Sequence, residues 1–211
     1  GVQTFALPNY LQSATRDRLL RAAAVLESML GSESRQLSTQ GRVIARDPHF
    51  LSVFRFPNLH ESRGAQARVA EMARGLHEIA GTDVFEILDE EGRLVSSVGP
   101  QTLDARARRR LSRPAVGGTS DASIVSMHQI QYQVAATPAV VEGEVVGVLV
   151  LGSRIDLALA RQLRRFTRSE VTFFSGQYQT VSTLADAADR RALGDAISSV
   201  ERAQGLMVAP N

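Results

Sequence analysis

The chain has 211 residues, 44% hydrophobic and 22% charged, which is ordinary for a globular protein with one large or two small domains. It has no Cys, which excludes disulfides, thiolate metal ligands and cysteine nucleophiles, and no Lys, which excludes Schiff-base catalysis and lysine-dependent phosphate loops. The formal net charge of +2 is small, and no apolar run reaches the roughly 18 residues typical of a membrane span.

The first predicted element is a long helix over 11–46, assigned to a domain of residues 1–46. Asn9 or Ser13 is expected to cap it, with Pro8 blocking extension backward. At 1.5 Å per residue it would run roughly 50 Å, too long for one small domain to cover. It is therefore expected to pair with the same helix of a second copy, giving a homodimer. Its seam follows alternating three- and four-residue steps and also takes in Glu33 and Gln40, so its second half is partly polar. The apolar members are Leu19, Ala23, Leu26, Leu30, Leu37 and Ile44.

Residues 46–56 interrupt this helix at Asp47-Pro48 and restart as a short apolar turn. A second helix is predicted over 64–79, with one apolar stripe, and Gly81 ends it.

The periodicity then changes to two in "FEILDEEGRLVSSVG", residues 85–99. The pattern predicts a hairpin that pairs 83–89 with 93–99, and Gly92 supplies the positive φ of the turn. An arginine-rich helix or turn is expected at 103–113, followed by a loop, "PAVGGTSD". Three further strands are predicted at 123–129, 132–140 and 144–152, and Pro138 indicates an edge position or a bulge.

The order of elements in residues 47–153 is therefore helix, two strands, helix and three strands. Short connections make neighbouring strands antiparallel, so the sequence predicts an α+β lobe with a PAS-like five-stranded antiparallel sheet and helices on one face. Residues 154–211 start the same order again with a helix at 154–166, a hairpin at 170–184, a helix at 185–203 and the start of a strand. We interpret them as a second PAS-like lobe that is incomplete, and the chain as a fragment or a processed protein.

Two segments resemble the extracytoplasmic Cache sensor domains of bacteria: "FEILDEEGRLVSSVG" and, some forty residues on, "AATPAVVEGEVVGVLVLGSRID". "LALARQLRRFTRSEVTFFSGQYQTVSTL" looks like the join into the second lobe of a double Cache domain. The resemblance covers roughly residues 10–205 and rests on the order and spacing of these elements.

This resemblance implies a periplasmic sensor module of an inner-membrane receptor. Transmembrane helices would flank it and lead to a histidine kinase, chemoreceptor or cyclic-nucleotide enzyme. The module itself would bind a small molecule without catalysis or cofactor. The family's amino-acid-binding motif, an aromatic-rich signature with a paired Arg and Asp, is not recognisable here, so the ligand class stays open.

The residues offer little support for an active site or a metal site. The four histidines are His49, His60, His77 and His128, and no GxSxG elbow accompanies them. His60-Glu61 and His77-Glu78 lack the i, i+4 spacing of paired metal ligands. "LDEEG" lacks the alternating ligands and distal Glu of a calcium loop, so turn solubility explains it better.

A binding pocket over the sheet is the more plausible site, because alternate strand residues can line a cavity. Arg154, just past the last strand, could hold a carboxylate in two parallel hydrogen bonds, so a small carboxylate is one candidate ligand. Ordinary core packing is the competing explanation for the apolar candidates. The predicted ligand-binding residues are Phe85, Ile87, His128, Tyr132, Thr137 and Arg154.

Two other functions remain open. The chain could be a dimerisation or spacer module that transmits partner signals without a ligand, in which case side chains or solvent would fill the pocket. The arginine runs at 106–113 and 154–168 could bind nucleic acid phosphates, but such runs are more often solvated helix faces, so no nucleic-acid partner is expected.

Overall fold

The computed structural model describes residues 6–56, 59–168, 170–175 and 178–195. The chain forms two compact units: Gly31–Arg154, here the sheet unit, and Gly1–Leu30 with Ile155–Asn211, here the hairpin unit. Helix α1, Ala6–Ala45, begins in the hairpin unit and ends in the sheet unit. The predicted long helix is confirmed, but it starts before Pro8, which lies in the first turn, where a missing N–H costs no hydrogen bond.

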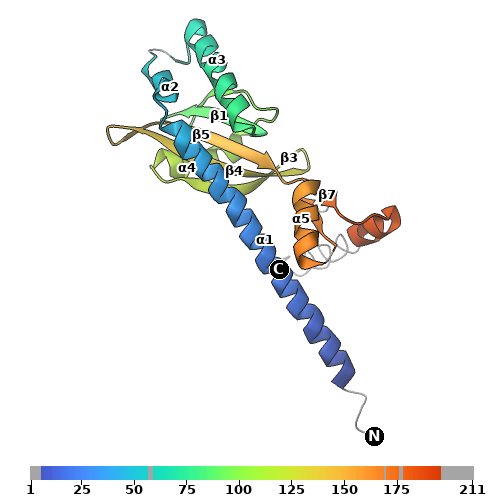
Figure 1. Ribbon diagram of the computed structural model, residues 1–211. Helices are drawn as coiled ribbons and strands as arrows, with labels where there is room; N and C mark the ends of the chain where they lie inside the picture. The colour runs from blue at the N-terminus through green and yellow to red at the C-terminus, as the bar shows by residue number, and fades with distance from the viewer. Residues whose placement is uncertain (1–5, 57–58, 169, 176–177, 196–211) are drawn as a thin grey trace, which may run out of the picture. The chain divides into compact units, whose positions relative to one another are not determined.

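The sheet unit continues with short helices and then one sheet (Figure 1). Its five strands lie in the order β2-β1-β5-β4-β3, and all neighbours pair antiparallel, as the sequence predicts. The elements are α2 Pro48–Leu51, η1 Ser52–Arg55, α3 Arg63–Ala80, β1 Val84–Asp89, β2 Leu94–Ser97, α4 Ala105–Val116, β3 Asp121–Met127, β4 Ile130–Val141 and β5 Glu144–Arg154.

Tight turns set the register of the sheet. Gly92 bends the β1–β2 connection at φ +79, as predicted, and Glu142-Gly143 joins β4 to β5 with both residues at positive φ. His128-Gln129 joins β3 to β4 in the same way, at φ 49 and 65. Two consecutive positive φ values match the twist of the flanking strands. Pro138 lies beyond the last β3 partner of β4 and beside a bulge, which confirms its predicted position.

Helices cover both faces of this sheet, so the expectation of one covered face is wrong. Figure 1 shows α3 on one side and α4 on the other. The α1–α3 face holds Phe85, Ile87, Leu149 and Leu151, and the α4 face holds Val84, Leu88, Val148 and Val150. Both sets are fully buried, because strands that are apolar on both sides need cover on both sides.

Helix α4 extends further than the sequence indicates. Asp104 caps its start, since its Oδ1 accepts from the N–H groups of Arg106 and Ala107, both at 2.8 Å. The helix continues through Pro114 to Val116, where a loop was expected. Buried Leu111 and Ala115 pack on the sheet and hold these last residues helical.

The last turns of α1 lie against the sheet. Leu37 and Ile44, both in the predicted seam, are buried in the core of the α1–α3 face. Gly41 allows the closest approach, because a Cβ there would lie 2.5 Å from Thr137 Oγ1 on β4. Gln40 Nε2 donates to the carbonyl of Ala80 at 2.8 Å. The C-terminal part of the seam therefore packs in the core of its own chain and does not face a second copy.

The hairpin unit contains α5, Leu157–Thr167, and a two-stranded sheet of β6, Thr172–Ser175, and β7, Tyr178–Ser182. The predicted hairpin is confirmed, and residues 187–195 are helical within the predicted 185–203. The predicted final strand lies outside the described residues. None of the described helices is both long and apolar enough to cross a membrane.

We expect Gly41→Ala to destabilise the chain by about 1–3 kcal/mol, because the new methyl group overpacks against Thr137. Alanine would otherwise raise helix stability by roughly 1 kcal/mol at such a site. Gly75→Ala in α3 is the matched control, since a Cβ there meets nothing within 4 Å, and it should stabilise. Urea denaturation measures both. Adding Thr137→Ala to Gly41→Ala should reduce the loss of stability, because it removes the hydroxyl that the new methyl group meets. If the two substitutions changed the free energy of unfolding additively, the proposed clash would be wrong.

Candidate functional site

The six residues predicted to bind ligand lie in different parts of the sheet unit. Phe85, Ile87 and Thr137 share the α1–α3 face, and each is at most 2% exposed. The two apolar side chains belong to the packed core. The Thr137 hydroxyl is a buried group without a hydrogen-bond partner in the structure, and it faces Gly41 of α1.

Tyr132 and Arg154 come together on the α4 face, where they are directly opposed on β4 and β5. Burial raises the pKa of the Tyr132 phenol, and the nearby Arg154 charge opposes that rise. Arg154 is exposed, and its backbone N–H donates to Asp83 Oδ2 at 2.8 Å. Among the six predicted residues, Tyr132 and Arg154 are the two that the sheet places opposite each other, and they bring a hydroxyl beside a cation.

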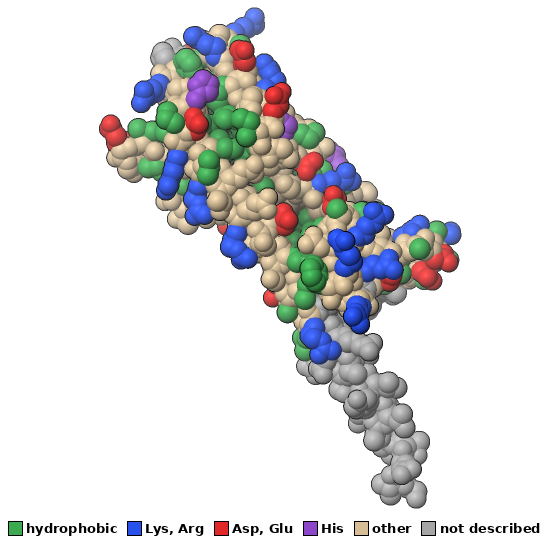
Figure 2. Space-filling model, in the orientation of Figure 1, with side chains coloured by type: hydrophobic (Ala, Val, Ile, Leu, Met, Phe, Trp, Pro, Cys, Tyr) green, Lys and Arg blue, Asp and Glu red, His purple; other side chains and the backbone are tan. Residues whose placement is uncertain are grey.

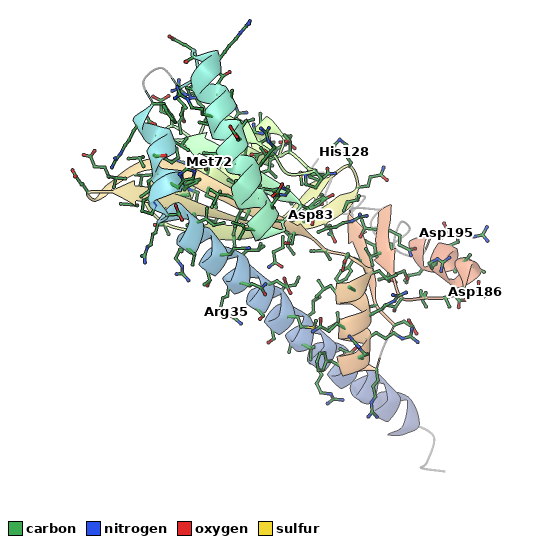
Figure 3. All side chains as sticks on the ribbon, turned by 45° about the horizontal axis from the view of Figure 1, so that its top comes forward. Arg35, Met72, Asp83, His128, Asp186 and Asp195 are labelled. Carbon is green, nitrogen blue, oxygen red and sulfur yellow. The ribbon has the colours of Figure 1, made fainter. Side chains whose placement is uncertain are left out.

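His128 lies apart from the other five. Figure 3 shows it at the turn between β3 and β4, where it is exposed. No cavity described in the sheet unit includes any of the six, and ligand binding by them stays a prediction.

A polar cavity of about 340 Å³ lies instead at the end of β1 on the α1–α3 face. It is within the size range of small-molecule sites. Phe54 of η1 closes it on one side, and its ring occupies the space that a side chain on Gly147 of β5 would take. The described lining residues are Phe54, Phe56, Leu59, His60, Glu61, Asp89, Glu90 and Arg93.

Asp89 is the centre of this cavity and is 3% exposed. Its Oδ2 accepts from Arg93 Nε and contacts His60 Nε2, both at 2.7 Å. Its Oδ1 accepts from the N–H groups of Glu91, at 3.0 Å, and Arg93, at 2.8 Å. The carboxylate therefore ties the β1–β2 turn to the segment after η1.

These contacts determine the charge of the group. Burial acts to raise the pKa of Asp89, but the hydrogen bonds from Arg93, His60 and the Glu91 N–H outweigh it, so the pKa lies below its ordinary value. The same hydrogen bond to Asp89 raises the pKa of the Arg93 guanidinium. Both groups are charged near neutral pH.

Sequence reasoning missed this site. It considered His60 and "LDEEG" separately, as metal ligands, and rejected both. They are 29 residues apart in the chain, and only the fold brings His60 to Asp89. Within the described residues, no group of three or more His, Asp or Glu side chains is arranged to hold a metal ion.

The α4 face carries a second buried carboxylate. Glu86 is completely buried, and Arg108 of α4 binds it with two hydrogen bonds, of 2.8 and 3.0 Å. Glu86 also accepts from the N–H of Leu103, whose carbonyl accepts from Arg108. Both carboxylate oxygens of Glu86 therefore accept hydrogen bonds, from Arg108 and from the segment just before α4.

No protein family model and no curated protein sequence matches this chain. Several solved structures align with it. The periplasmic domain of Vibrio cholerae LuxQ aligns with a TM-score of 0.58 at 14% identity, covering 80% of each chain. The sensor domain of the V. cholerae histidine kinase DctB aligns with a TM-score of 0.54 at 13% identity, covering 83% of this chain and 68% of that one.

Identities this low show the fold alone. The chain has the fold of bacterial periplasmic sensor domains, which confirms the resemblance to Cache domains at the level of architecture.

We expect Asp89→Asn to lower the free energy of unfolding by about 1–3 kcal/mol near neutral pH, because buried charge-assisted hydrogen bonds are lost. The lowered pKa means that the folded state keeps the Asp89 charge to a lower pH than the unfolded chain does. The stability contributed by the Asp89 carboxylate is therefore fully present above its unfolded-state pKa of about 3.9. It is lost as the pH falls through the lower pKa of the folded state.

Urea titrations from neutral to acidic pH would measure this. The difference in the free energy of unfolding between wild type and Asp89→Asn should become smaller below about pH 4. The exposed Glu90→Gln is the control, and it should change stability little. A gap that widens toward acidic pH would contradict the assignment.

Proposed function

We propose that this chain is the periplasmic ligand-sensing region of a transmembrane signalling receptor, a sensor histidine kinase or a chemoreceptor. The observation that carries the proposal is the fold shared with the LuxQ and DctB sensor domains. Membrane segments and an output domain in the intact receptor would convert binding into a signal, and the region itself would be non-catalytic.

The polar cavity at Asp89 supports small-molecule binding. Arg93, whose side chain is 60% exposed, and His60 offer donors to a ligand carboxylate. Asp89, Glu61 and Glu90 surround the same space with negative charge. This mixture favours a small carboxylate that also carries a positive group, because a simple anion would meet three acidic side chains.

Signalling would run through α1. The cavity wall formed by Phe54, Phe56, Leu59 and His60 follows α1 in the chain, after the break at Asp47-Pro48. Ligand closure would move this wall and shift the end of α1 against the sheet, where Gly41 and Thr137 are in close contact. The shift can be no larger than the difference in ligand affinity between the two states allows.

A second candidate is a spacer or dimerisation module that transmits a partner's signal without its own ligand. The observation that favours it is the α4 face, where Glu86 and Arg108 fill the space beside the sheet with a satisfied ion pair.

Thermal-shift screening of the full chain against small carboxylates and amino acids tests the first candidate. We expect a stabilising ligand, and Arg93→Met should weaken its binding by roughly 10-fold or more, as loss of a charge-assisted hydrogen bond does. Calorimetry measures the affinity. The exposed Arg55→Met in η1 is the matched control and should bind normally.

Arg154→Met completes this design. If it abolishes binding and Arg93→Met does not, the ligand site is the Tyr132–Arg154 pair and the cavity assignment is wrong. A panel without any stabiliser would count against ligand sensing and favour the spacer function.

The homodimer is proposed to form through the part of the α1 seam that precedes Gly31, since Leu37 and Ile44 are buried in their own chain. Ala23 lies in this seam, and Ala24 lies beside it. We expect Ala23→Glu to weaken dimerisation at least 10-fold, because it places a charge in the seam. Ala24→Glu, which adds the same charge outside the seam, should have little effect. Sedimentation velocity measures both, and equal effects would contradict a seam at these positions.

A further inference from the structure

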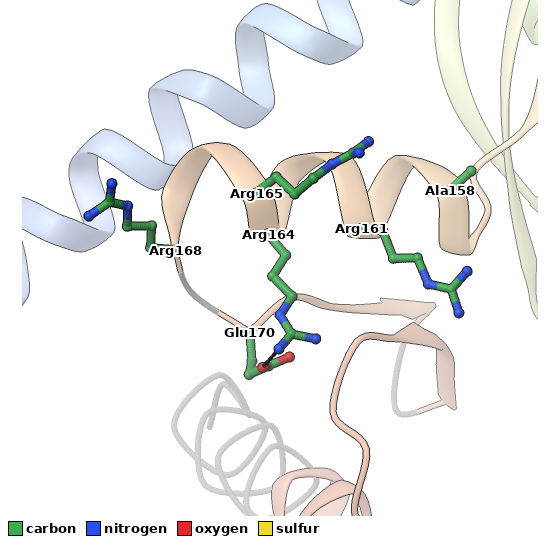
Figure 4. A pocket seen from close by; sticks show the side chains of 6 residues that line it. All are labelled: Ala158, Arg161, Arg164, Arg165, Arg168 and Glu170. Carbon is green, nitrogen blue, oxygen red and sulfur yellow. Dashed lines mark ion pairs between the residues drawn. The ribbon is translucent and has the colours of Figure 1, made fainter.

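Helix α5 of the hairpin unit presents a face of arginines. Arg161, Arg164 and Arg165 lie in the helix and Arg168 at its end, a spacing that places all four on one side. All four are exposed. With Ala158 and Glu170 they line, among the described residues, a hollow of about 790 Å³ (Figure 4). Figure 2 shows basic side chains gathered over α5.

The opposite side of α5 fixes this orientation. Ala160 and Leu163 are buried, and Asp156 caps the start of the helix by accepting from the N–H of Leu159 at 3.1 Å. The helix cannot turn its arginines inward without exposing this apolar side. The basic face is therefore held toward solvent.

Helix stability explains only part of this arginine face. Arg161 and Arg165, like Arg164 and Arg168, are four residues apart, and like charges at that spacing destabilise a helix. Within the described residues, one carboxylate is paired with this face: Glu170, 3.0 Å from Arg164. The favourable charge at the helix C-terminus accounts for the last three arginines but not for Arg161.

Two features decide which anion fits. The four arginines extend over eight residues, roughly 10 Å along the helix axis, which matches a surface with many phosphates better than one small anion. Leu157, four residues before Arg161, lies on the arginine side of the helix and is 36% exposed. Exposed apolar side chains next to a basic helix face are typical of helices that lie in the headgroup region of a bilayer.

We propose that α5 docks the hairpin unit on an anionic phospholipid surface. The arginines bind the phosphates, and Leu157 inserts among the headgroups. The proposal relies on the proposed function for placing the domain beside a membrane, but vesicle binding is measured without any sensor ligand. The two can therefore fail separately.

Cosedimentation of the full chain with vesicles tests this proposal. We expect binding to equal parts phosphatidylcholine and phosphatidylglycerol, little binding to phosphatidylcholine alone, and weaker binding at high salt. The double substitution Arg161→Gln with Arg165→Gln should lower affinity roughly 30-fold, given about 1 kcal/mol per basic residue near the surface. Leu157→Ser should weaken binding without changing the charge.

The matched control is Arg109→Gln with Arg110→Gln, two exposed arginines of α4 that carry the same charge change. It should bind vesicles almost normally. Circular dichroism checks that each variant is folded. Equal loss in both double variants, or equal binding to neutral vesicles, would overturn the proposal.

Competition separates the other sources of phosphate. Glycerol phosphate in solution should not displace the vesicles. Efficient displacement would indicate a site for a small anion instead. Duplex DNA that binds with higher affinity than the vesicles, and loses binding with the α5 substitutions, would assign the face to nucleic acid and would also overturn the proposal.

Discussion

The sheet unit depends on one constraint: every side chain of β1 is buried, and two of the six are carboxylates. Glu86 and Asp89 lie on opposite faces of the strand, and a buried charge is tolerated only if it is paired and hydrogen-bonded. Each carboxylate therefore fixes the segment that supplies its partners. Glu86 holds α4 through Arg108, and Asp89 holds the β1–β2 turn and the segment after η1 through Arg93 and His60.

The partners of the two carboxylates differ in their exposure to solvent. The Glu86–Arg108 pair is enclosed, with Arg108 only 13% exposed, so its hydrogen bonds stabilise a closed face. At Asp89 the partners are partly exposed, with His60 at 37% and Arg93 at 60%. Charged groups held in place by a buried partner and still open to solvent are suited to recognising a ligand. This difference is why the cavity, rather than the α4 face, is the better candidate site.

The sequence predicted the strands, the antiparallel pairing of those joined by short turns, and the long helix, because hydrophobic periodicity and glycine turns are local signals. It did not predict cover on both faces, because a period-two pattern indicates one core face, whereas β1 is buried on both sides. It also did not distinguish a dimer seam from a core stripe in α1, since Leu37 and Ile44 satisfy both patterns.

The candidate site was harder to predict for a similar reason. An aspartate that precedes an acidic, glycine-containing turn is a readable signal, because its side chain commonly accepts from N–H groups a few residues on. Asp89 does so with Glu91 and Arg93. The partner from a distant segment, His60, has no such local signature and follows only from the tertiary fold.

The same geometry links the site to α1 by a short physical path. Asp47 caps α2 directly after α1, and α2 leads into η1, which supplies Phe54 to the cavity. Gln40 and Gly41 anchor the end of α1 to α3 and to β4. Few residues therefore separate the cavity from the part of α1 that is packed closely against the sheet. Because tightly packed contacts change between discrete arrangements, the proposed signalling function requires that ligand binding at Asp89 select between two positions of α1.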